Sequence, residues 1–322
     1  MASPDYPQHN RDQTVRGRGI IFVMNDPYKI KRSPLRYPGG KSRAMEFLFS
    51  DENMPITPIK EYREPFLGGG SPAIAFSKRH PNTPVWVNDK YYNLYCFWKS
   101  LRDEGERMHS LVLEKRREYD TTTKAKELHE RLREEILEEK DEFEIAWRFY
   151  IINRCSFSGL TESSSFSELS SIGNWNENLI NGLLFYSRLI SNWKITNLDY
   201  GELLTDDPDT FVFLDPPYDL KKDYLLSGGD GEGLYGRKGE MHKGFNHVEF
   251  AEHLNNHDCM MMVTYNSNEN IRKLFEGWNQ TEWDLTYSMN NQSEAYKEAQ
   301  KDRKELLCTN YESSVSSLEA FL

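Results

Sequence analysis

One apolar segment that ends in a turn locked by two prolines constrains this chain more than any other feature. Residues 211–214 (Phe-Val-Phe-Leu) are apolar at every position, and Asp215 follows directly. A short, unbroken apolar run is typical of a strand buried on both faces, as in a parallel sheet covered by helices. Ligands of such open sheets bind at the carboxyl ends of the strands. Asp215 is therefore the first candidate functional residue.

The turn after this strand has the chemistry of a site for a planar amine. Pro216 and Pro217 fix the backbone and remove two N–H groups. The carbonyl groups of Asp215 and Pro216 then stand as fixed acceptors beside the carboxylate, and the ring of Tyr218 offers a flat face. The alternative is a surface turn in which the aspartate is only a cap. A buried strand that leads directly into the turn favours the site.

The rest of the chain alternates between expected strands and helices. Strands are expected near residues 59–66, 84–89, 193–200, 210–218, 259–266 and 304–311. Helices are expected at residues 71–80, 93–108, 247–256 and 268–278. This alternation predicts an α/β fold built on a doubly wound, Rossmann-like sheet.

The middle of the chain breaks the alternation. Residues 101–140 contain ten basic and twelve acidic side chains, which predicts solvated helices with charge pairs along their faces. Residues 153–178 are rich in Ser and Asn and are not expected to contribute regular core. We therefore expect an inserted, mainly helical domain at 101–189. It separates two parts of one larger domain, 20–100 and 190–322, and a flexible leader occupies residues 1–19.

A first glycine cluster, residues 38–42 (Pro-Gly-Gly-Lys-Ser), fails the template of a phosphate-binding loop. That loop needs a glycine five positions before its last glycine, and Leu35 occupies the position. An ATPase is therefore not indicated. Taken alone, the segment is also compatible with a plain Pro-Gly turn before a helix.

A second glycine cluster fits a nucleotide-binding turn better. Gly68, Gly70 and Ala73 match the pattern G-x-G-x-x-A between an expected strand and an expected helix. Asp89 lies nineteen residues after Gly70, at the end of the next expected strand, where a carboxylate can bind ribose hydroxyls. A dinucleotide dehydrogenase would show the same pattern, and so would a tight turn that binds nothing. The glycines alone leave the ligand open.

The charge balance excludes a protein that binds nucleic acid through a globally basic surface. The 40 Lys and Arg residues are outnumbered by 51 Asp and Glu residues, which gives a net charge of −11. The distribution is uneven, because residues 1–43 carry nine basic and three acidic side chains, a local charge of +6, and the remainder carries −17. An anionic partner is therefore expected near the N-terminal segment.

Neither a membrane nor an oxidising compartment is indicated. No apolar run approaches the roughly 20 residues of a membrane span, and the first residues lack the apolar core of a secretion signal. The cysteines are scattered without a C-x-x-C pair, which favours free thiols in a reducing cytosol. They are Cys96, Cys155, Cys259 and Cys308. We expect a cytoplasmic protein with no membrane partner.

The order of these motifs resembles the Dam-like (alpha-group) DNA adenine-N6 methyltransferases, which use S-adenosylmethionine. Seven segments carry the resemblance: 36–41 (RYPGGK), 64–71 (EPFLGGGS), 87–89 (VND), 153–160 (NRCSFSGL), 197–200 (NLDY), 215–218 (DPPY) and 303–307 (RKELL). The match covers most of residues 29–312. Ser158 departs from the family, which commonly has Asn there.

The resemblance implies a role for each set of residues. The catalytic set is Asp215, Pro216, Pro217 and Tyr218. The set that binds S-adenosylmethionine is Tyr37, Pro38, Gly39, Gly40, Lys41, Glu64, Pro65, Phe66, Gly68, Gly70, Ser71, Asp89, Asp199, Tyr200 and Asp215. The DNA-binding set is Arg36, Asn153, Arg154, Ser156 and Lys221, within the expected recognition domain at 101–189 or near the site. No metal is implied.

The implied reaction moves a methyl group to the exocyclic N6 of an adenine flipped out of double-stranded DNA, and it leaves S-adenosylhomocysteine. This is the reaction of a site-specific DNA-methyltransferase (adenine-specific), with a cognate restriction endonuclease as an expected partner in some such systems. The glycine-rich residues 219–246 fit either a cover for the flipped base or an ordinary disordered insertion. The alternatives are cytosine-N4 or RNA adenine methylation, a non-catalytic DNA-binding module, and a dehydrogenase.

Overall fold

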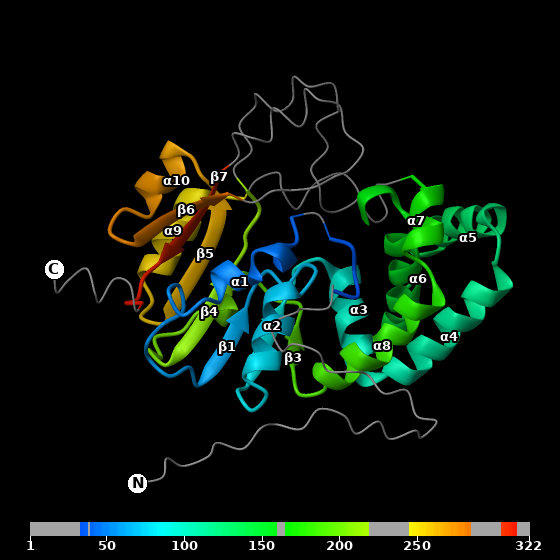
Figure 1. The fold of residues 1–322 in the computed structure, drawn as a ribbon, viewed down its shortest axis with the longest axis horizontal. Coiled ribbons are helices and arrows are strands. Elements are labelled where there is room, and N and C mark those ends of the chain that lie inside the picture. The colour runs from blue at the N-terminus through cyan, green and yellow to red at the C-terminus, as the bar shows by residue number, and fades with distance from the viewer. Residues whose placement is uncertain (1–32, 38, 160–164, 219–244, 285–303, 314–322) are drawn as a thin grey trace, which may run out of the picture.

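The computed structural model describes residues 33–37, 39–159, 165–218, 245–284 and 304–313, and it is built on a seven-stranded sheet (Figure 1). The strand order is β3-β2-β1-β4-β5-β7-β6. The parallel strands are β1 (Glu61–Glu64), β2 (Val85–Asn88), β3 (Lys194–Thr196), β4 (Thr210–Leu214) and β5 (Met260–Asn266). The antiparallel strands are β6 (Asn279–Asp284) and β7 (Lys304–Thr309). The expected doubly wound, Rossmann-like α/β fold is confirmed.

The strand order reverses between β1 and β4. The chain first moves outward from β1 to β2 and β3, and it then returns to place β4 on the other side of β1. In doubly wound sheets this switch point opens the crevice that binds ligands, at the carboxyl ends of the strands. Glu64 ends β1 and Asp215 follows β4. The topology therefore brings two of the expected site residues to the same edge of the sheet.

The side chains of β4 explain its unbroken apolar sequence. Phe211 and Phe213 pack into the core on one face of the sheet, whereas Val212 and Leu214 pack into the core on the other. All four are fully buried. A strand covered on both faces needs no polar position, so its sequence shows no alternation. Among the helices that accompany the sheet are α1 (Met45–Leu48), α2 (Ser71–Arg79), α9 (His247–Asn255) and α10 (Glu269–Leu274).

A group of helices joins β2 to β3 and lies to one side of the sheet (Figure 1). They are α3 (Tyr92–Asp103), α4 (Gly105–Glu118), α5 (Thr122–Glu135), α6 (Glu142–Cys155), α7 (Glu168–Gly173) and α8 (Glu177–Leu189). Helix α6 is buried along most of its length and packs against α3. One hydrophobic cluster runs from the sheet into these helices. The division into a catalytic and a target-recognition domain, with the bounds given above, stays a prediction.

One local expectation was wrong, and one strand was not expected at all. The helix expected at residues 93–108 is two helices, because α3 ends at Asp103 and α4 begins at Gly105. Gly105 permits close contact with α8, since a Cβ atom there would lie 2.2 Å from the Oγ atom of Ser187. Strand β6 was not expected, because its sequence (Asn-Gln-Thr-Glu-Trp-Asp) lacks the apolar alternation of a strand with one buried face.

The expectation that residues 153–178 contribute no regular core was also wrong. Helix α6 continues to Cys155, and Asn153 and Ser156 are fully buried. Trp175 is fully buried as well. Small polar side chains enter a core when internal hydrogen bonds replace their bonds to water, as those of Asn153 and Ser156 do.

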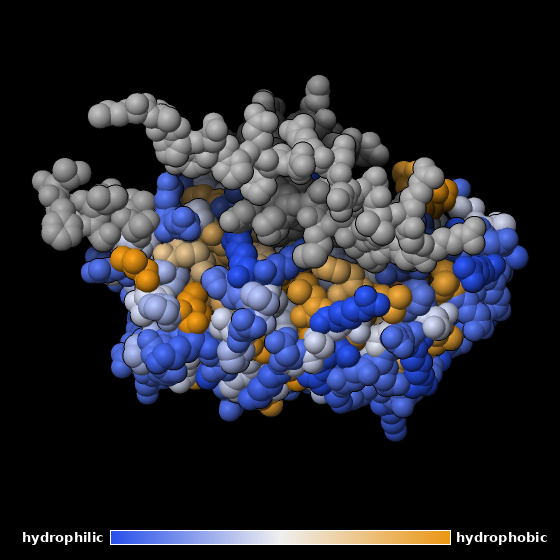
Figure 2. All heavy atoms as spheres, turned by 60° about the horizontal axis from the view of Figure 1, so that its bottom comes forward, coloured by the Kyte–Doolittle hydropathy of each residue, from blue (hydrophilic) through white to orange (hydrophobic). Residues whose placement is uncertain are grey.

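Some expectations lie outside the described residues. These are the leader at 1–19, nearly all of the segment at 219–246, and the individual residues Pro38 and Lys221. Within the described part of the chain, no helix combines the length and the apolar character needed to cross a membrane. The face shown in Figure 2 is largely hydrophilic, with smaller apolar patches between the polar residues.

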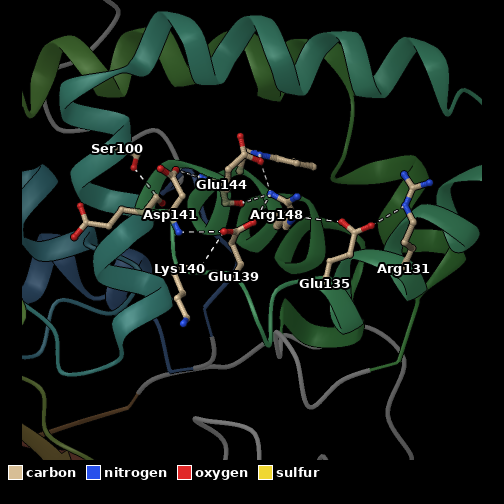
Figure 3. A network of polar contacts seen from close by, with 10 residues as sticks. Ser100, Arg131, Glu135, Glu139, Lys140, Asp141, Glu144 and Arg148 are labelled. Atoms are coloured by element: carbon tan, nitrogen blue, oxygen red, sulfur yellow. Dashed lines mark hydrogen bonds and ion pairs between the residues drawn. The ribbon is translucent and has the colours of Figure 1, made fainter.

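A network of charged side chains holds the corner between α5 and α6 (Figure 3). Arg148 forms ion pairs with Glu135, Glu139 and Glu144, and its guanidinium lies 4.4 Å from the ring centroid of Trp147. The start of α6 is also capped, since a side-chain oxygen of Asp141 accepts a hydrogen bond from the backbone N–H of Glu144. The corner therefore fixes the beginning of the helix whose other end approaches the site.

Candidate active site

The carboxylate of Asp215 is held from two sides. The Nζ atom of Lys41 lies 2.8 Å from both carboxylate oxygens, and the Oγ1 atom of Thr264, on β5, donates to Oδ1 at 2.7 Å. The side chain of Lys41 is 2% exposed and that of Asp215 is 23% exposed. A buried ammonium is tolerated when it is paired and hydrogen-bonded. The carboxylate therefore has one fixed orientation at the end of β4.

The ring of Tyr218 is oriented by the last described strand. Its hydroxyl donates to Oε2 of Glu305 at 2.5 Å, and Glu305 on β7 is buried opposite Asn266 of β5. The ammonium of Lys41 lies 4.9 Å from the centroid of the Tyr218 ring. Catalytic-motif residues 215 and 218 are thus anchored by residues far away in the sequence.

The glycine turn after β1 packs against Trp98. Gly68 and Gly70 have positive φ angles of 48° and 67°, which residues other than glycine adopt only with strain. The indole N–H of Trp98 donates to the carbonyl of Gly68 at 3.0 Å, and a Cβ atom on Gly70 would lie 2.7 Å from the Trp98 ring. Both glycines are required by backbone conformation and by close packing.

Asp89 closes the same turn from the end of β2. Its Oδ2 accepts the backbone N–H of Gly68 at 2.9 Å, and its Oδ1 accepts that of Tyr91 at 2.9 Å. Burial raises the pKa of Asp89 to about 6, against the lowering effect of these two hydrogen bonds. Asp89 as a whole residue is half-buried, and both of its carboxylate oxygens are already used in holding the turn.

Glu64 lies beneath the turn as a buried carboxyl group. Burial raises its pKa well above the ordinary value, and a hydrogen bond from Tyr62 at 2.6 Å opposes that rise. The backbone N–H of Ala73 also bonds to Glu64. This N–H belongs to the first turn of α2, whose N-cap residue Gly70 has no side chain to satisfy it. Glu64 therefore supports the start of α2.

Two aromatic rings predicted to bind the methyl donor stack on each other. The ring centroids of Phe66 and Tyr200 are 5.7 Å apart with an interplanar angle of 24°. Phe245 and Phe250 contact the pair with their edges. Phe66 and Tyr200 are half-buried. The adjacent Asp199 is exposed and forms an ion pair with Lys90 at 2.9 Å.

The structure gathers most of the described residues of the methyl-donor set around the ends of β1, β2 and β4. Pro65 and Ser71 are buried in and after the glycine turn, whereas Gly39 is exposed and Gly40 half-buried before Lys41. Pro216 is buried and Pro217 half-buried at the end of β4. The part played by each residue in binding stays a prediction.

Sequence reasoning missed residues that fix the site from behind. Asn88 is buried at the end of β2, and its side chain bonds to the carbonyls of Pro65 and Leu198 and to the backbone N–H of Leu198. It thereby ties the turns after β1 and β3. Thr264 and Glu305 were missed as well. The available signal was a single polar residue inside an apolar strand, such as Thr264 after Met-Met-Met-Val.

The expected DNA-binding residues lie together but largely point inward. Asn153 and Ser156 are fully buried, Arg154 is 4% exposed, and Arg36 is half-buried. The Nε atom of Arg154 donates to the carbonyl of Asn174 at 2.6 Å, and Ser156 bonds to His129 at 3.0 Å. DNA contact by these residues stays a prediction. Lys221 lies outside the described residues.

Comparisons with known proteins agree with this geometry. Residues 37–289 match the model of the D12 class N6 adenine-specific DNA methyltransferases. The chain belongs to this family. It is also similar to the type II methyltransferase M.MjaIII of Methanocaldococcus jannaschii, with 26% identity over 199 residues that cover 57% of this chain and 68% of the relative. The expected family and its reaction, adenine methylation of DNA, are confirmed.

The family implies S-adenosylmethionine as the methyl donor, and the chemistry of the site fits this molecule. Asp89 presents a carboxylate suited to hydroxyl groups, and the stacked pair of Phe66 and Tyr200 presents a flat apolar face. The carboxylate oxygens of Asp215 add hydrogen-bond acceptors near the turn, and Lys41 balances their charge. These three features lie on adjacent loops at one edge of the sheet.

Proposed function

We propose that the chain is a site-specific adenine-N6 DNA methyltransferase in which Asp215 holds the amine of the target adenine. The observation that supports this proposal is the hydrogen bonding of the carboxylate. Oδ1 accepts from Lys41 and Thr264, whereas Oδ2 accepts from Lys41 alone among the described residues. A carboxylate oxygen has two lone pairs, so Oδ2 keeps one acceptor position for an incoming N–H.

Asp215 and Pro216 would prepare the amine for methylation. The N6 lone pair of adenine is delocalised into the ring, which makes the amine a weak nucleophile. Hydrogen bonds from its two N–H groups to Oδ2 of Asp215 and to the carbonyl of Pro216 favour a tetrahedral nitrogen. The carboxylate then stabilises the positive charge that develops on nitrogen, because it is oriented in advance by Lys41 and Thr264.

The methyl donor would be held at the neighbouring turns. Asp89 binds the ribose hydroxyls, Phe66 and Tyr200 contact the adenine ring, and the glycine turn passes beneath the amino acid part. When bound, S-adenosylmethionine supplies a methyl group activated by the positive sulfur. The order of the motifs in the chain and the position of Asp89 at the end of β2 support this assignment.

The target base would leave the duplex before it reaches Asp215. A base inside the helix cannot approach a carboxylate at the end of a strand, and enzymes that modify bases extrude them into a pocket. Tyr218 offers the stacking face, since its hydroxyl is fixed by Glu305 while the ring stays half-buried. Phosphate contacts would come from basic residues, and the sequence offers Arg36 and Lys221 as candidates.

The similarity to a type II methyltransferase also suggests a partner protein. A type II methyltransferase is similar to this chain, so we propose a cognate restriction endonuclease as a partner. All four cysteines are free and buried, which suits a protein that binds DNA in the reducing cytoplasm.

The product distinguishes this function from its alternatives. The full chain is incubated with S-adenosylmethionine and either unmethylated duplex DNA or RNA, and the products are digested to nucleosides for mass analysis. We expect N6-methyladenine from DNA alone. N4-methylcytosine, or methylation of RNA alone, would overturn the adenine DNA assignment. Methylation-sensitive sequencing of DNA from cells that express the chain would then give the target sequence.

A further inference from the structure

A short N-terminal segment lies between the glycine turn and the end of α6. We define the strap as residues 33–37 and 39–41, which precede α1. On one side the strap contacts the turn after β1, and on the other it contacts residues 153–159. These two partners are 84 residues or more apart in sequence and belong to different parts of the molecule, the sheet edge and the helical region.

Asn153 binds the strap as a neighbouring strand would. Its Oδ1 accepts the backbone N–H of Arg36 at 2.9 Å, and its Nδ2 donates to the backbone carbonyl of Arg36 at 2.7 Å. The same Nδ2 also donates to the carbonyl of Gly159 at 3.0 Å. One fully buried side chain therefore satisfies both backbone groups of a residue 117 positions earlier. Such a contact fixes position and orientation together.

Gly159 allows the strap to come this close. Its φ angle is 72°, and a Cβ atom there would lie 2.3 Å from the carbonyl oxygen of Arg36 and 2.7 Å from its Cβ. Two further bonds reinforce the contact: the guanidinium of Arg36 donates to the carbonyl of Ser156 at 2.8 Å, and that of Arg154 donates to the carbonyl of Pro34 at 3.3 Å.

The other side of the strap reaches both the glycine turn and Asp215. Tyr37 lies on the glycine turn, where a Cβ atom on Gly68 or Gly69 would lie 2.9 Å from a Tyr37 carbon. The hydroxyl of Ser33 donates to the carbonyl of Gly69. At the end of the strap, Lys41 binds both oxygens of Asp215. A shift of the strap would therefore disturb the turn and the catalytic carboxylate at once.

We propose that Asn153 and Gly159 are positioning residues, which set the methyl-donor turn and the Asp215 carboxylate through the strap. The inference rests on the proposed roles of the glycine turn and Asp215. It gives residues 153–159 (N-R-x-x-F-x-G) a structural role within the protein. They join the helical region to the glycine turn and to Asp215. Displacement of the strap from residues 153–159 therefore weakens the binding of S-adenosylmethionine even in the absence of DNA.

The first test compares two glycine variants of the full chain. Gly159→Ala places a methyl group against Arg36, whereas Gly173→Ala, at the end of α7, adds one where nothing lies within 4 Å. Calorimetric titration with S-adenosylmethionine in the absence of DNA should show at least a tenfold loss of affinity in Gly159→Ala and none in Gly173→Ala. Hydrogen exchange at the N–H of Arg36 should be faster in Gly159→Ala alone.

A second comparison separates positioning from a general loss of stability. Arg148→Met weakens the α5–α6 corner on the same helix but does not touch the strap. It should lower the melting temperature and keep the affinity for S-adenosylmethionine, whereas Asn153→Ala should weaken that affinity at least tenfold. The double variant Asn153→Ala/Gly159→Ala should lose little beyond either single variant, because both break one contact.

The results that overturn the inference are distinct from those that overturn the enzyme assignment. Unchanged affinity in folded Gly159→Ala or Asn153→Ala refutes the positioning role, and so does an equal loss in Arg148→Met. If Gly159→Ala does not fold, Asn153→Ala against Arg148→Met decides the question alone. A wild-type chain that binds S-adenosylmethionine but does not methylate DNA refutes the proposed function and leaves the binding comparison valid.

Discussion

Two charged clusters of this molecule, one at the sheet edge and one at the α5–α6 corner, are built in opposite ways. At the sheet edge, one buried lysine meets one aspartate, and the two side chains are 2% and 23% exposed. At the α5–α6 corner, Arg148 meets three glutamates whose side chains are 25–42% exposed. The first cluster has one carboxylate for its ammonium among the described residues, whereas the second has spare partners close to water.

This difference indicates which cluster tolerates change. An ion pair at the surface contributes little, because water competes for both charges and several partners can replace one another. Removal of one member of a buried pair leaves the other charge without compensation. At the corner, the loss of one ion pair therefore leaves others in place. At the sheet edge, the orientation of the Asp215 carboxylate depends on its ion pair with Lys41. Three predictions test this contrast and a fourth concerns the neighbouring Asp89; they run from the largest expected effect to the smallest.

Asp215→Ala should cause the largest loss. Without the oriented carboxylate, methyl transfer to DNA should fall on the order of 10³-fold or more, while S-adenosylmethionine still binds. The variant also leaves Lys41 buried without its partner, which should lower the free energy of unfolding by about 3–5 kcal/mol. Transfer of labelled methyl groups and denaturant titration measure the two effects. Normal methylation by this variant would exclude Asp215 from the reaction.

Lys41→Met should damage activity more than stability. Methionine fills the buried space without a charge, and Asp215 keeps its bond from Thr264 and its access to water. We expect a decrease in kcat on the order of 10²-fold and a loss of about 1–3 kcal/mol in unfolding free energy. Single-turnover methylation and denaturant titration give the comparison with Asp215→Ala. An equal or greater loss of stability in Lys41→Met would contradict the asymmetry of the pair.

Binding of the methyl donor should weaken in acid because of Asp89. Its pKa is raised to about 6 by burial, and the charged form is the better acceptor for ribose hydroxyls. Affinity should therefore fall about tenfold per pH unit below pH 6, as measured by calorimetric titration. Asp89→Asn should bind weakly at every pH. A flat profile in the wild-type chain would remove Asp89 from the ribose site.

The raised pKa of Asp89 affects stability in the opposite direction: acid weakens ligand binding but favours the folded state. The folded chain holds the Asp89 proton more tightly than the unfolded chain, whose carboxyl keeps the ordinary pKa near 3.8. This contribution to stability is complete below pH 3.8 and is lost as the pH rises through about 6. At neutral pH, the charged carboxylate thus favours binding at some expense of folding.

Arg148→Met should have the smallest effect of the four. The three glutamates are partly exposed and reach water when the guanidinium is removed. We expect a loss of about 1 kcal/mol in unfolding free energy and methylation within about twofold of the wild type. Thermal unfolding and steady-state kinetics on the same preparation check both values. A catalytic defect larger than the stability defect would show that the corner acts on the site.

Six of the seven described strands were predictable because local patterns mark them, whereas β6 carries no such pattern. Residues 211–214 are apolar on both faces, and the glycine turn at Gly68 and Gly70 has a backbone requirement that only glycine meets without strain. The residues that orient Asp215 and Tyr218 were not predicted. Thr264 and Glu305 form hydrogen bonds with partners 49 and 87 positions away, and no local pattern marks such a partner. Asn153 was predicted to belong to the recognition region. The residues next to it in sequence give no sign that it binds the backbone of Arg36.

The insertion of β7 between β5 and β6 affects the order in which the sheet can assemble during synthesis. Strand β6 leaves the ribosome before β7, the strand with which it pairs in the described sheet. Its polar sequence, Asn-Gln-Thr-Glu-Trp-Asp, suits a segment that must stay hydrated in the meantime. Glu305 arrives with β7, so the bond that orients Tyr218 forms late. A nascent chain would thus orient the ring of Tyr218 only after the segments that carry Glu64, Asp89 and Asp215 have left the ribosome.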